Sequence, residues 1–165
     1  KEMDELIADN RIFWGLSPLF DAVPRIKIFN NTPEEVIPRN IIEQVETTRS
    51  AQKHLDDLLG QKAVFDNPKP VDLISHLIEI TQMPKDSLVM DFFAGSGTTF
   101  EAVCELNSRD GGKRRCILVQ KPEEILKNEN SGDRPLYKTI SEICRTRCQK
   151  VSDLYGEKIQ FINLE

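Results

Sequence analysis

Short apolar runs alternate with amphipathic stretches in the second half of the chain. The runs at 88–90 and 115–120 predict two buried strands. Residues 158–164 alternate apolar and polar positions and predict a further strand. Apolar residues recur at helical spacing, which predicts amphipathic helices, in the stretches 70–81, 98–106 and 135–155. A helix followed by the order β-α-β-α-β predicts an α/β fold, in the form of one wing of a doubly wound sheet.

The first half has weaker patterns. The expected elements are a short helix at 3–9, strands at 11–14 and 25–29, a loop at 16–24, a connector at 30–38 and a helix at 47–59. Thr47 or Thr48 suits the N-cap of that last helix, and Gly60 suits its end. Trp14 is the only tryptophan. We interpret it as a core residue, with stacking on a nucleic-acid base as the alternative.

Composition indicates a soluble globular protein. Of the 165 residues, 39% are hydrophobic and 30% are charged. The sequence contains no apolar run near 18 residues, so we expect no membrane span and a cytoplasmic location. The sequence begins with Lys1 and lacks signal-peptide character, which suggests a piece of a longer protein.

The net charge is −5, which is unusual for a protein that only binds nucleic acid. Two groups of basic residues are interpreted as solvated loop and helix faces: Arg109, Lys113, Arg114 and Arg115, then Lys138, Arg145, Arg147 and Lys150. The cysteines form no C-x-x-C pair, and we expect reduced, packing thiols and no metal site at Cys104, Cys116, Cys144 and Cys148.

A glycine turn at 94–97 separates the first apolar run from the helix that begins near Thr98. A strand that leads through such a turn into a helix N-terminus is a common cofactor site in α/β proteins. Phe100 occupies the place of the third glycine of a dinucleotide fingerprint, which argues against a nicotinamide dehydrogenase. No lysine follows Gly97, which excludes a phosphate-binding loop.

The residues from Asp91 to Thr99 read D-F-F-A-G-S-G-T-T, which resembles motif I of S-adenosylmethionine-dependent methyltransferases that modify DNA amino groups. Residues 67–70 read N-P-K-P and resemble motif X, which directly precedes motif I in the β-class of these enzymes. Residues 117–123 read I-L-V-Q-K-P-E and resemble the Mod subunits of type III restriction-modification systems. The resemblance therefore implies a Rossmann-like methyltransferase sheet and S-adenosylmethionine as cofactor.

The resemblance also implies a set of cofactor-binding residues. Asp91 and the turn hold the amino-acid end of the cofactor, and Lys69 lies on its carboxylate side unless it is only a solvated lysine at a helix start. Gln120 meets the ribose, with Glu123 as the alternative, and Pro122 or residues beside Ile117 flank the adenine. The full set is Asn67, Lys69, Pro70, Asp91, Phe92, Phe93, Ala94, Gly95, Ser96, Gly97, Thr98, Thr99, Gln120 and Pro122.

The catalytic motif of the family, [D/N/S]-P-P-[Y/F], does not occur in this sequence. In family members it binds the target amino group and stacks on the flipped base. The nearest candidate has Lys69 in place of its second proline and no aromatic residue. We therefore expect residues 1–60 to end a preceding catalytic or target-recognition region, and 61–165 to form the cofactor-binding part. No catalytic residue is predicted, and the chain alone is expected to be inactive.

The resemblance implies a site-specific DNA methyltransferase of a restriction-modification system, with adenine N6 a better candidate target than cytosine N4. Its implied partners are double-stranded DNA through the intact protein, a restriction subunit and a second copy, and no membrane. The alternative from a different class is a non-catalytic DNA-binding or subunit-docking module, in which residues 30–59 recognise DNA or a partner.

Overall fold

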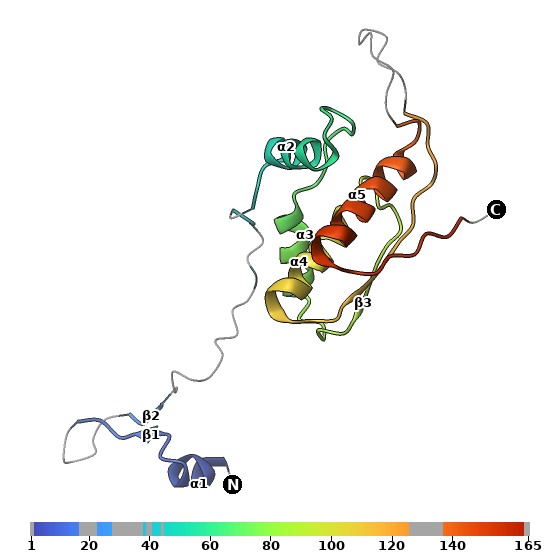
Figure 1. Cartoon of the computed structure of the whole chain (residues 1–165). Helices are drawn as coiled ribbons and strands as arrows, with labels where there is room; N and C mark the ends of the chain where they lie inside the picture. Colours follow the sequence, from blue (N-terminus) through green and yellow to red (C-terminus); the bar gives the residue numbers. More distant parts are fainter. Residues whose placement is uncertain are drawn as a thin grey trace. The chain divides into compact units, whose positions relative to one another are not determined.

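The computed structural model describes residues 2–16, 23–27, 38, 41–43, 45–125 and 137–163. The chain forms two compact units, Lys1–Arg39 and Asn40–Glu165. Figure 1 labels their helices and strands. The predicted division at residue 60 concerns function and stays a prediction.

The first unit consists of a helix and a strand pair. Its elements are α1 (Glu2–Ala8), β1 (Ile12–Phe13) and β2 (Arg25–Ile26). The two strands are antiparallel, with Ile12 opposite Ile26. Trp14 is 39% exposed, so its interpretation as a core residue is wrong. The expected strand residues 28–29, most of the loop and nearly all of the connector lie outside the described residues.

Helix α2 (Thr48–Leu59) opens the described helices of the second unit, with the caps that the sequence predicted. The Thr47 hydroxyl accepts a hydrogen bond from the Ser50 N–H, which satisfies one N–H of the first turn. Gly60 ends the helix in the left-handed conformation at φ 74°. The apolar stripe of α2 buries Leu55 and Leu59 against α5 and its flanking residues.

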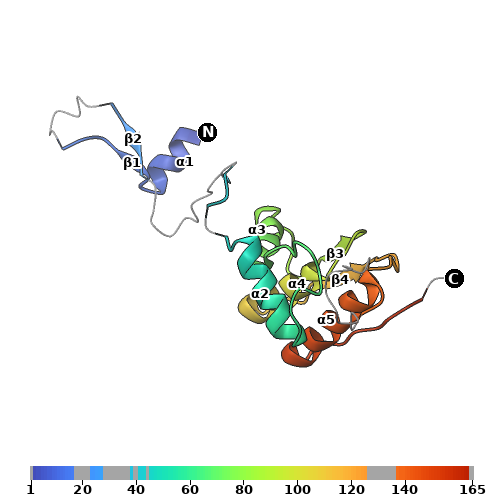
Figure 2. The same cartoon turned by 90° about the horizontal axis from the view of Figure 1, so that it is seen from above.

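A β-α-β unit follows α3, as expected. Its elements are α3 (Val71–Ile80), β3 (Leu88–Asp91), α4 (Thr98–Asp110) and β4 (Arg115–Leu118). The strands are parallel, with Met90 opposite Ile117, and α4 packs against α3 (Figures 1 and 2). Buried residues of the two helices form one core cluster together with partly buried strand residues: Ile78, Ala102, Val103, Leu106, Val89 and Cys116.

The described residues cover only one face of the strand pair, which corrects the expectation of two buried strands. Leu88 and Met90 are 48% and 47% exposed, and Ile117 and Val119 are 43% and 37% exposed. The helices cover the opposite face, where Val89 contacts the core of α3 and α4. A short apolar run has the same sequence pattern whether one face or both are covered, so the run alone could not distinguish the two cases.

Helix α5 (Ile140–Tyr155) begins later than predicted. The Thr139 hydroxyl caps it by accepting from the Glu142 N–H at 3.3 Å, and the Lys138 N–H donates to Glu142 Oε2 at 2.6 Å. Thr139 also forms an isolated β-bridge with Glu124. Residues 137–139 are therefore not helical because their main chain pairs with another segment, and 135–136 lie outside the described residues.

The last expected strand is absent from the described residues 157–163. Ile159 instead packs against the cluster formed by Ala94, Cys144 and Cys148. Leu164 lies outside the described residues. The second unit therefore contains β-α-β followed by a helix, a mixed helix and strand arrangement compatible with an α/β methyltransferase fold. Among the described residues, no helix is both long enough and apolar enough to span a membrane.

The first group of basic residues pairs with carboxylates. Arg109 Nη2 lies 2.6 Å from Glu79 Oε1, and Arg114 Nη2 lies 2.8 Å from Asp110 Oδ2. The side chain of Arg114 is 7% exposed, so the interpretation of this group as solvated is wrong for Arg114. The Arg114 hydrogen bonds hold the pKa of Asp110 well below its ordinary value.

Candidate functional site

The glycine turn connects β3 to α4. The Gly97 N–H donates to the Ala94 carbonyl at 2.8 Å, and both Gly95 and Gly97 adopt positive φ values of 55° and 85°. Gly97 is the N-cap of α4 and supplies no side-chain hydrogen bond to the first turn. N–H groups of that turn are therefore available to a ligand, and an anionic group suits a helix N-terminus.

The carboxylate of Asp91 braces both sides of this turn. Its Oδ1 accepts from the Phe93 N–H at 3.0 Å, and its Oδ2 accepts from the Thr99 hydroxyl at 2.5 Å. Each carboxylate oxygen can accept a second hydrogen bond. Asp91 therefore orders the turn and retains acceptor capacity for a ligand.

The end of β4 reaches the same turn. The Ala94 N–H donates to the Val119 carbonyl at 3.1 Å, and the Gly95 N–H donates to Gln120 Oε1 at 2.7 Å. Gln120 Nε2 donates to the Lys121 carbonyl at 3.0 Å. The amide predicted to meet the ribose thus lies at the turn with both ends hydrogen-bonded.

The alternative ribose residue, Glu123, is exposed and bonds through its main chain to Lys121 and Ile140. The hydrogen bonds of the described residues therefore bring Gln120, and not Glu123, to the glycine turn.

The N-P-K-P segment lies beside the turn as well. The Thr98 hydroxyl donates to the Lys69 carbonyl at 3.4 Å. Pro68 and Pro70 are buried, whereas Asn67 and Lys69 are exposed. The motif X and motif I segments therefore meet, with the Lys69 side chain at the surface.

Phe65 also contacts the turn, although it belongs to none of the motifs identified in the sequence. A Cβ atom on Gly95 would lie 3.3 Å from the Phe65 ring, so the ring packs directly against this glycine. At the surface of the site, Phe92 and Phe93 are 61% and 92% exposed, and Pro122 is exposed. These side chains supply apolar surface at the carboxyl ends of the strands.

A buried ion pair lies behind the turn, and the sequence did not predict it. Arg147 of α5 is 1% exposed, and its Nε donates to Glu101 Oε2 of α4 at 2.7 Å. Arg147 Nη1 donates to the hydroxyls of Ser96 at 3.0 Å and Thr98 at 2.8 Å. The interpretation of Arg147 as part of a solvated helix face is therefore wrong.

His54 of α2 completes this network, with its Nε2 2.5 Å from Glu101 Oε1. The hydrogen bond to Glu101 raises the pKa of His54. Burial alone would raise the pKa of Glu101, but the hydrogen bonds and charges of His54 and Arg147 outweigh burial and lower it. The network therefore favours a charged imidazolium, carboxylate and guanidinium together.

The same face of α5 also contacts the turn backbone. A Cβ atom on Gly97 would lie 3.1 Å from Cys148 Sγ and 3.2 Å from Cys144 Sγ. Both thiols are free and buried. The absence of a side chain at Gly97 is thus what allows α5 to approach the turn.

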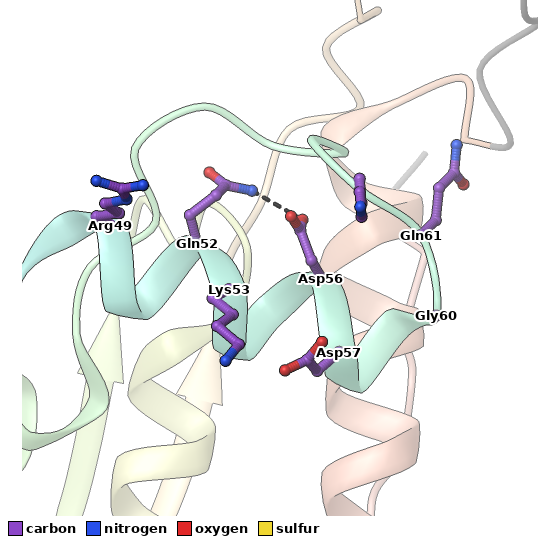
Figure 3. A pocket seen from close by; sticks show the side chains of 8 residues that line it. Arg49, Gln52, Lys53, Asp56, Asp57, Gly60 and Gln61 are labelled. Atoms are coloured by element: carbon purple, nitrogen blue, oxygen red, sulfur yellow. Dashed lines mark hydrogen bonds between the residues drawn. The ribbon is translucent and has the colours of Figure 1, made fainter.

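A surface hollow of about 630 Å³ lies along α2 and the turn that follows it (Figure 3). Gln52 hydrogen-bonds to Asp56 within it. Its lining combines both signs of charge and contains none of the predicted cofactor residues: Arg49, Gln52, Lys53, Asp56, Asp57, Gly60, Gln61 and Lys62. We assign no function to this hollow.

A family model described as DNA methylase matches residues 14–131. The chain belongs to this DNA methylase family. The match includes both segments that resemble the methyltransferase motifs, at 67–70 and 91–99.

Three curated relatives show which kinds of DNA methylase the chain resembles. The EcoPI Mod subunit of a type III restriction-modification enzyme from Escherichia phage P1 is 48% identical over 115 residues, which cover 69% of this chain and 17% of that protein. The StyLTI Mod subunit from Salmonella typhimurium is 35% identical over 148 residues, covering 90% of this chain and 22% of the relative. Type II methyltransferase M.KpnI from Klebsiella pneumoniae is 34% identical over 148 residues, which cover 87% of this chain and 34% of that protein.

The DNA methylase chain is therefore similar to Mod subunits but spans only about a fifth of their length. The resemblance to this group, first based on the motifs around Asp91 and Gln120, is confirmed. The roles of the individual residues at the turn stay predictions.

Proposed function

We propose that this chain is the cofactor-binding part of a site-specific DNA methyltransferase. In the intact protein a methyl group passes from S-adenosylmethionine to an exocyclic amino group of a base, preferentially N6 of adenine, within a restriction-modification system. The observation that carries the proposal is that three segments meet at the carboxyl ends of two parallel strands: the glycine turn, the N-P-K-P segment and Gln120. Ligands bind at this edge of open α/β sheets.

The side chains present fit such a cofactor. The first turn of α4 offers N–H groups to a carboxylate, and the exposed Lys69, whose carbonyl accepts from Thr98, is the candidate cation. Gln120 is suited to the ribose hydroxyls, because its carbonyl oxygen can accept a second hydrogen bond. Phe92, Phe93 and Pro122 offer apolar surface to the adenine. Bound there, S-adenosylmethionine supplies an electrophilic methyl group.

The chemical step requires residues beyond these. No two prolines are adjacent in the sequence, so the family's catalytic motif is missing. We therefore propose that this chain binds cofactor but does not methylate DNA alone. Double-stranded DNA, a restriction subunit and a second copy are the proposed partners of the intact protein.

Calorimetric titration of the chain with S-adenosylhomocysteine tests the cofactor proposal. We expect saturable binding that Asp91→Ala weakens by at least about tenfold, since it removes charge-assisted hydrogen bonds worth about 1.5–3 kcal/mol. Asp91→Asn distinguishes the effect of losing the negative charge from the effect of losing the hydrogen bonds that hold the turn. Asp86→Ala, at the other end of the same strand segment, is the matched control and should bind as the wild type does.

A chain that unfolds cooperatively but shows no binding would contradict the proposal. If such a chain also shifted a DNA duplex with a steep salt dependence, the DNA-binding module would be the better interpretation.

A further inference from the structure

We propose that Arg147 is a positioning residue that holds Ser96 and Thr98 in the conformation that binds the cofactor, with Glu101 and His54 fixing Arg147 in turn. This inference rests on the cofactor-binding function proposed above. The residues that it adds to the site, Arg147, Glu101 and His54, lie outside both motif segments and contact the turn, directly or through one another, from behind.

The contacts of Arg147 fix both neighbours of Gly97. One guanidinium nitrogen, Nη1, donates to Ser96 Oγ at 3.0 Å and to Thr98 Oγ1 at 2.8 Å. The Nε of the same planar group donates to Glu101 Oε2 at 2.7 Å. Because the guanidinium is rigid, the bond to Glu101 determines where Nη1 lies. Arg147 therefore sets the positions of two hydroxyls at once.

Arg147 also determines where the Thr98 hydroxyl proton points. A guanidinium can only donate, so the Thr98 oxygen accepts from it and its single proton must go elsewhere. The Lys69 carbonyl, 3.4 Å away, is the acceptor. Arg147, Thr98 and Lys69 thus form a directed chain that joins the glycine turn to the N-P-K-P segment.

A purely structural contact between α4 and α5 would not need this arrangement. Burying an arginine is unfavourable unless all its donors are used well, and an apolar pair of similar size often packs as stably. Moreover, the same face of α5 presses Cys144 and Cys148 against Gly97. Within the described part of the chain, the polar contacts of Arg147 other than the one to Glu101 go to Ser96 in the turn and to Thr98 directly after it.

His54 and Glu101 keep the guanidinium in place. Glu101 is 4% exposed and uses one oxygen for Arg147 and the other for His54. With both oxygens bonded, the carboxylate has one favoured orientation. Helix α2 thereby contributes to the turn through two intervening side chains.

The test is Arg147→Lys, measured by unfolding and by titration with S-adenosylhomocysteine. Lysine retains the charge beside Glu101 but lacks the planar group that reaches both hydroxyls. We expect a folded but less stable protein, because the two buried hydroxyls lose their donor, and binding weakened by at least about tenfold under conditions in which the variant stays folded. Arg145→Lys on the exposed side of the same helix is the matched control and should change neither quantity.

A double-mutant cycle that combines Arg147→Lys with Thr98→Val tests whether Arg147 acts through the Thr98 hydroxyl. If Arg147 acts in part through Thr98, the double variant loses less affinity than the product of the two single fold-losses, with the remainder passing through Ser96. Fold-losses that multiply, or Arg147→Lys binding within about twofold of wild type, would overturn the inference.

Amide hydrogen exchange separates this inference from the proposed function. Arg147→Lys should speed exchange of the hydrogen-bonded amides of Gly95 and Gly97 without changing exchange in the second half of α3. If wild type fails to bind cofactor, the proposed function fails and the exchange result still decides the positioning role. A different result would contradict only the inference. In that case wild type binds, Asp91→Ala abolishes binding, and Arg147→Lys alters neither binding nor exchange at the turn.

Discussion

The side-chain oxygen of Gln120 accepts a hydrogen bond from the main-chain N–H of Gly95 at 2.7 Å. Gln120, two residues after β4, is thus tied directly to the turn that follows β3. Because the two strands are parallel neighbours, this bond joins their carboxyl ends across the sheet. Gln120 therefore has a part in shaping the turn as well as its proposed part in binding ribose.

Substitutions of Gln120 should separate these parts. Gln120→Leu should weaken S-adenosylhomocysteine binding about tenfold, because it removes the acceptor for Gly95 and the ribose partner. Gln120→Glu should bind better than Gln120→Leu, because a carboxylate accepts from both groups with charge assistance, although it loses the donor to the Lys121 carbonyl. Titration calorimetry measures both. Glu123→Gln is the control, and if it loses binding while Gln120→Leu does not, Glu123 is the ribose ligand.

Gly97→Ala should destabilise the protein more than Gly111→Ala. Both glycines have positive φ, 85° and 67°, where a side chain costs about 1–2 kcal/mol. At Gly111 nothing lies within 4 Å of the added Cβ, whereas at Gly97 it would meet two buried thiols. We expect a further cost of about 1–3 kcal/mol from overpacking at Gly97. Urea unfolding measures the difference, and equal losses would show that α5 does not constrain the turn.

His54 should make stability depend on pH. Its pKa is raised above 6.5, chiefly by the hydrogen bond to Glu101, because this bond and the charges of Glu101 and Glu46 outweigh burial and Arg147, which lower it. Its contribution is therefore fully present below about pH 6.5 and is lost as the pH rises through the raised folded pKa. The pKa of Glu101 is lowered, so its contribution is present above about pH 4.3 and is lost as the pH falls through the lowered folded pKa.

Urea midpoints of wild type and His54→Gln across this range test the prediction. The stability advantage of wild type should be largest between about pH 4.3 and 6.5 and should shrink toward higher pH. His76→Gln, which changes the chain's other histidine, is the control. A difference between wild type and His54→Gln that stays constant with pH would mean that the imidazole does not change charge in this range.

The open face of the strand pair should bind apolar molecules. Leu88, Met90, Ile117 and Val119 share it. Parallel sheets normally have both faces covered, and contiguous exposed apolar surface favours association. Met90→Lys combined with Ile117→Lys should lower both dye binding and self-association, measured by fluorescence and sedimentation. Leu154→Lys removes an exposed apolar side chain from α5 and should have little effect.

Local signals in the sequence predicted the elements that local interactions determine. Thr47 and Gly60 define α2 because each satisfies main-chain groups within its own helix end. The turn at 94–97 was predictable because positive φ values favour glycine, as at Gly95 and Gly97. The closing strand at 158–164 was not found in the described part of the chain, because alternation indicates two different faces but not a neighbouring strand.

The buried network escaped prediction because its members are far apart in the sequence. One signal could have found it. Arg147 follows Ile143 and Cys144 by four and three residues and therefore lies on the apolar stripe of α5. Glu101 similarly lies among the buried residues of α4. A charge on each of two apolar helix faces indicates a buried pair, but only the packing of the helices shows that they meet.

The hydrogen bonds to the glycine turn have a consequence for how the protein is synthesised. Gln120 lies 25 residues after Gly95, and Arg147 lies 51 residues after Ser96. When the turn leaves the ribosome, the two groups that hold it in place have not yet emerged. The strand and helix on either side of it can form early, but the turn reaches its final shape only after α5 has emerged. The proposed cofactor site is therefore complete only after nearly the whole of this segment has left the ribosome.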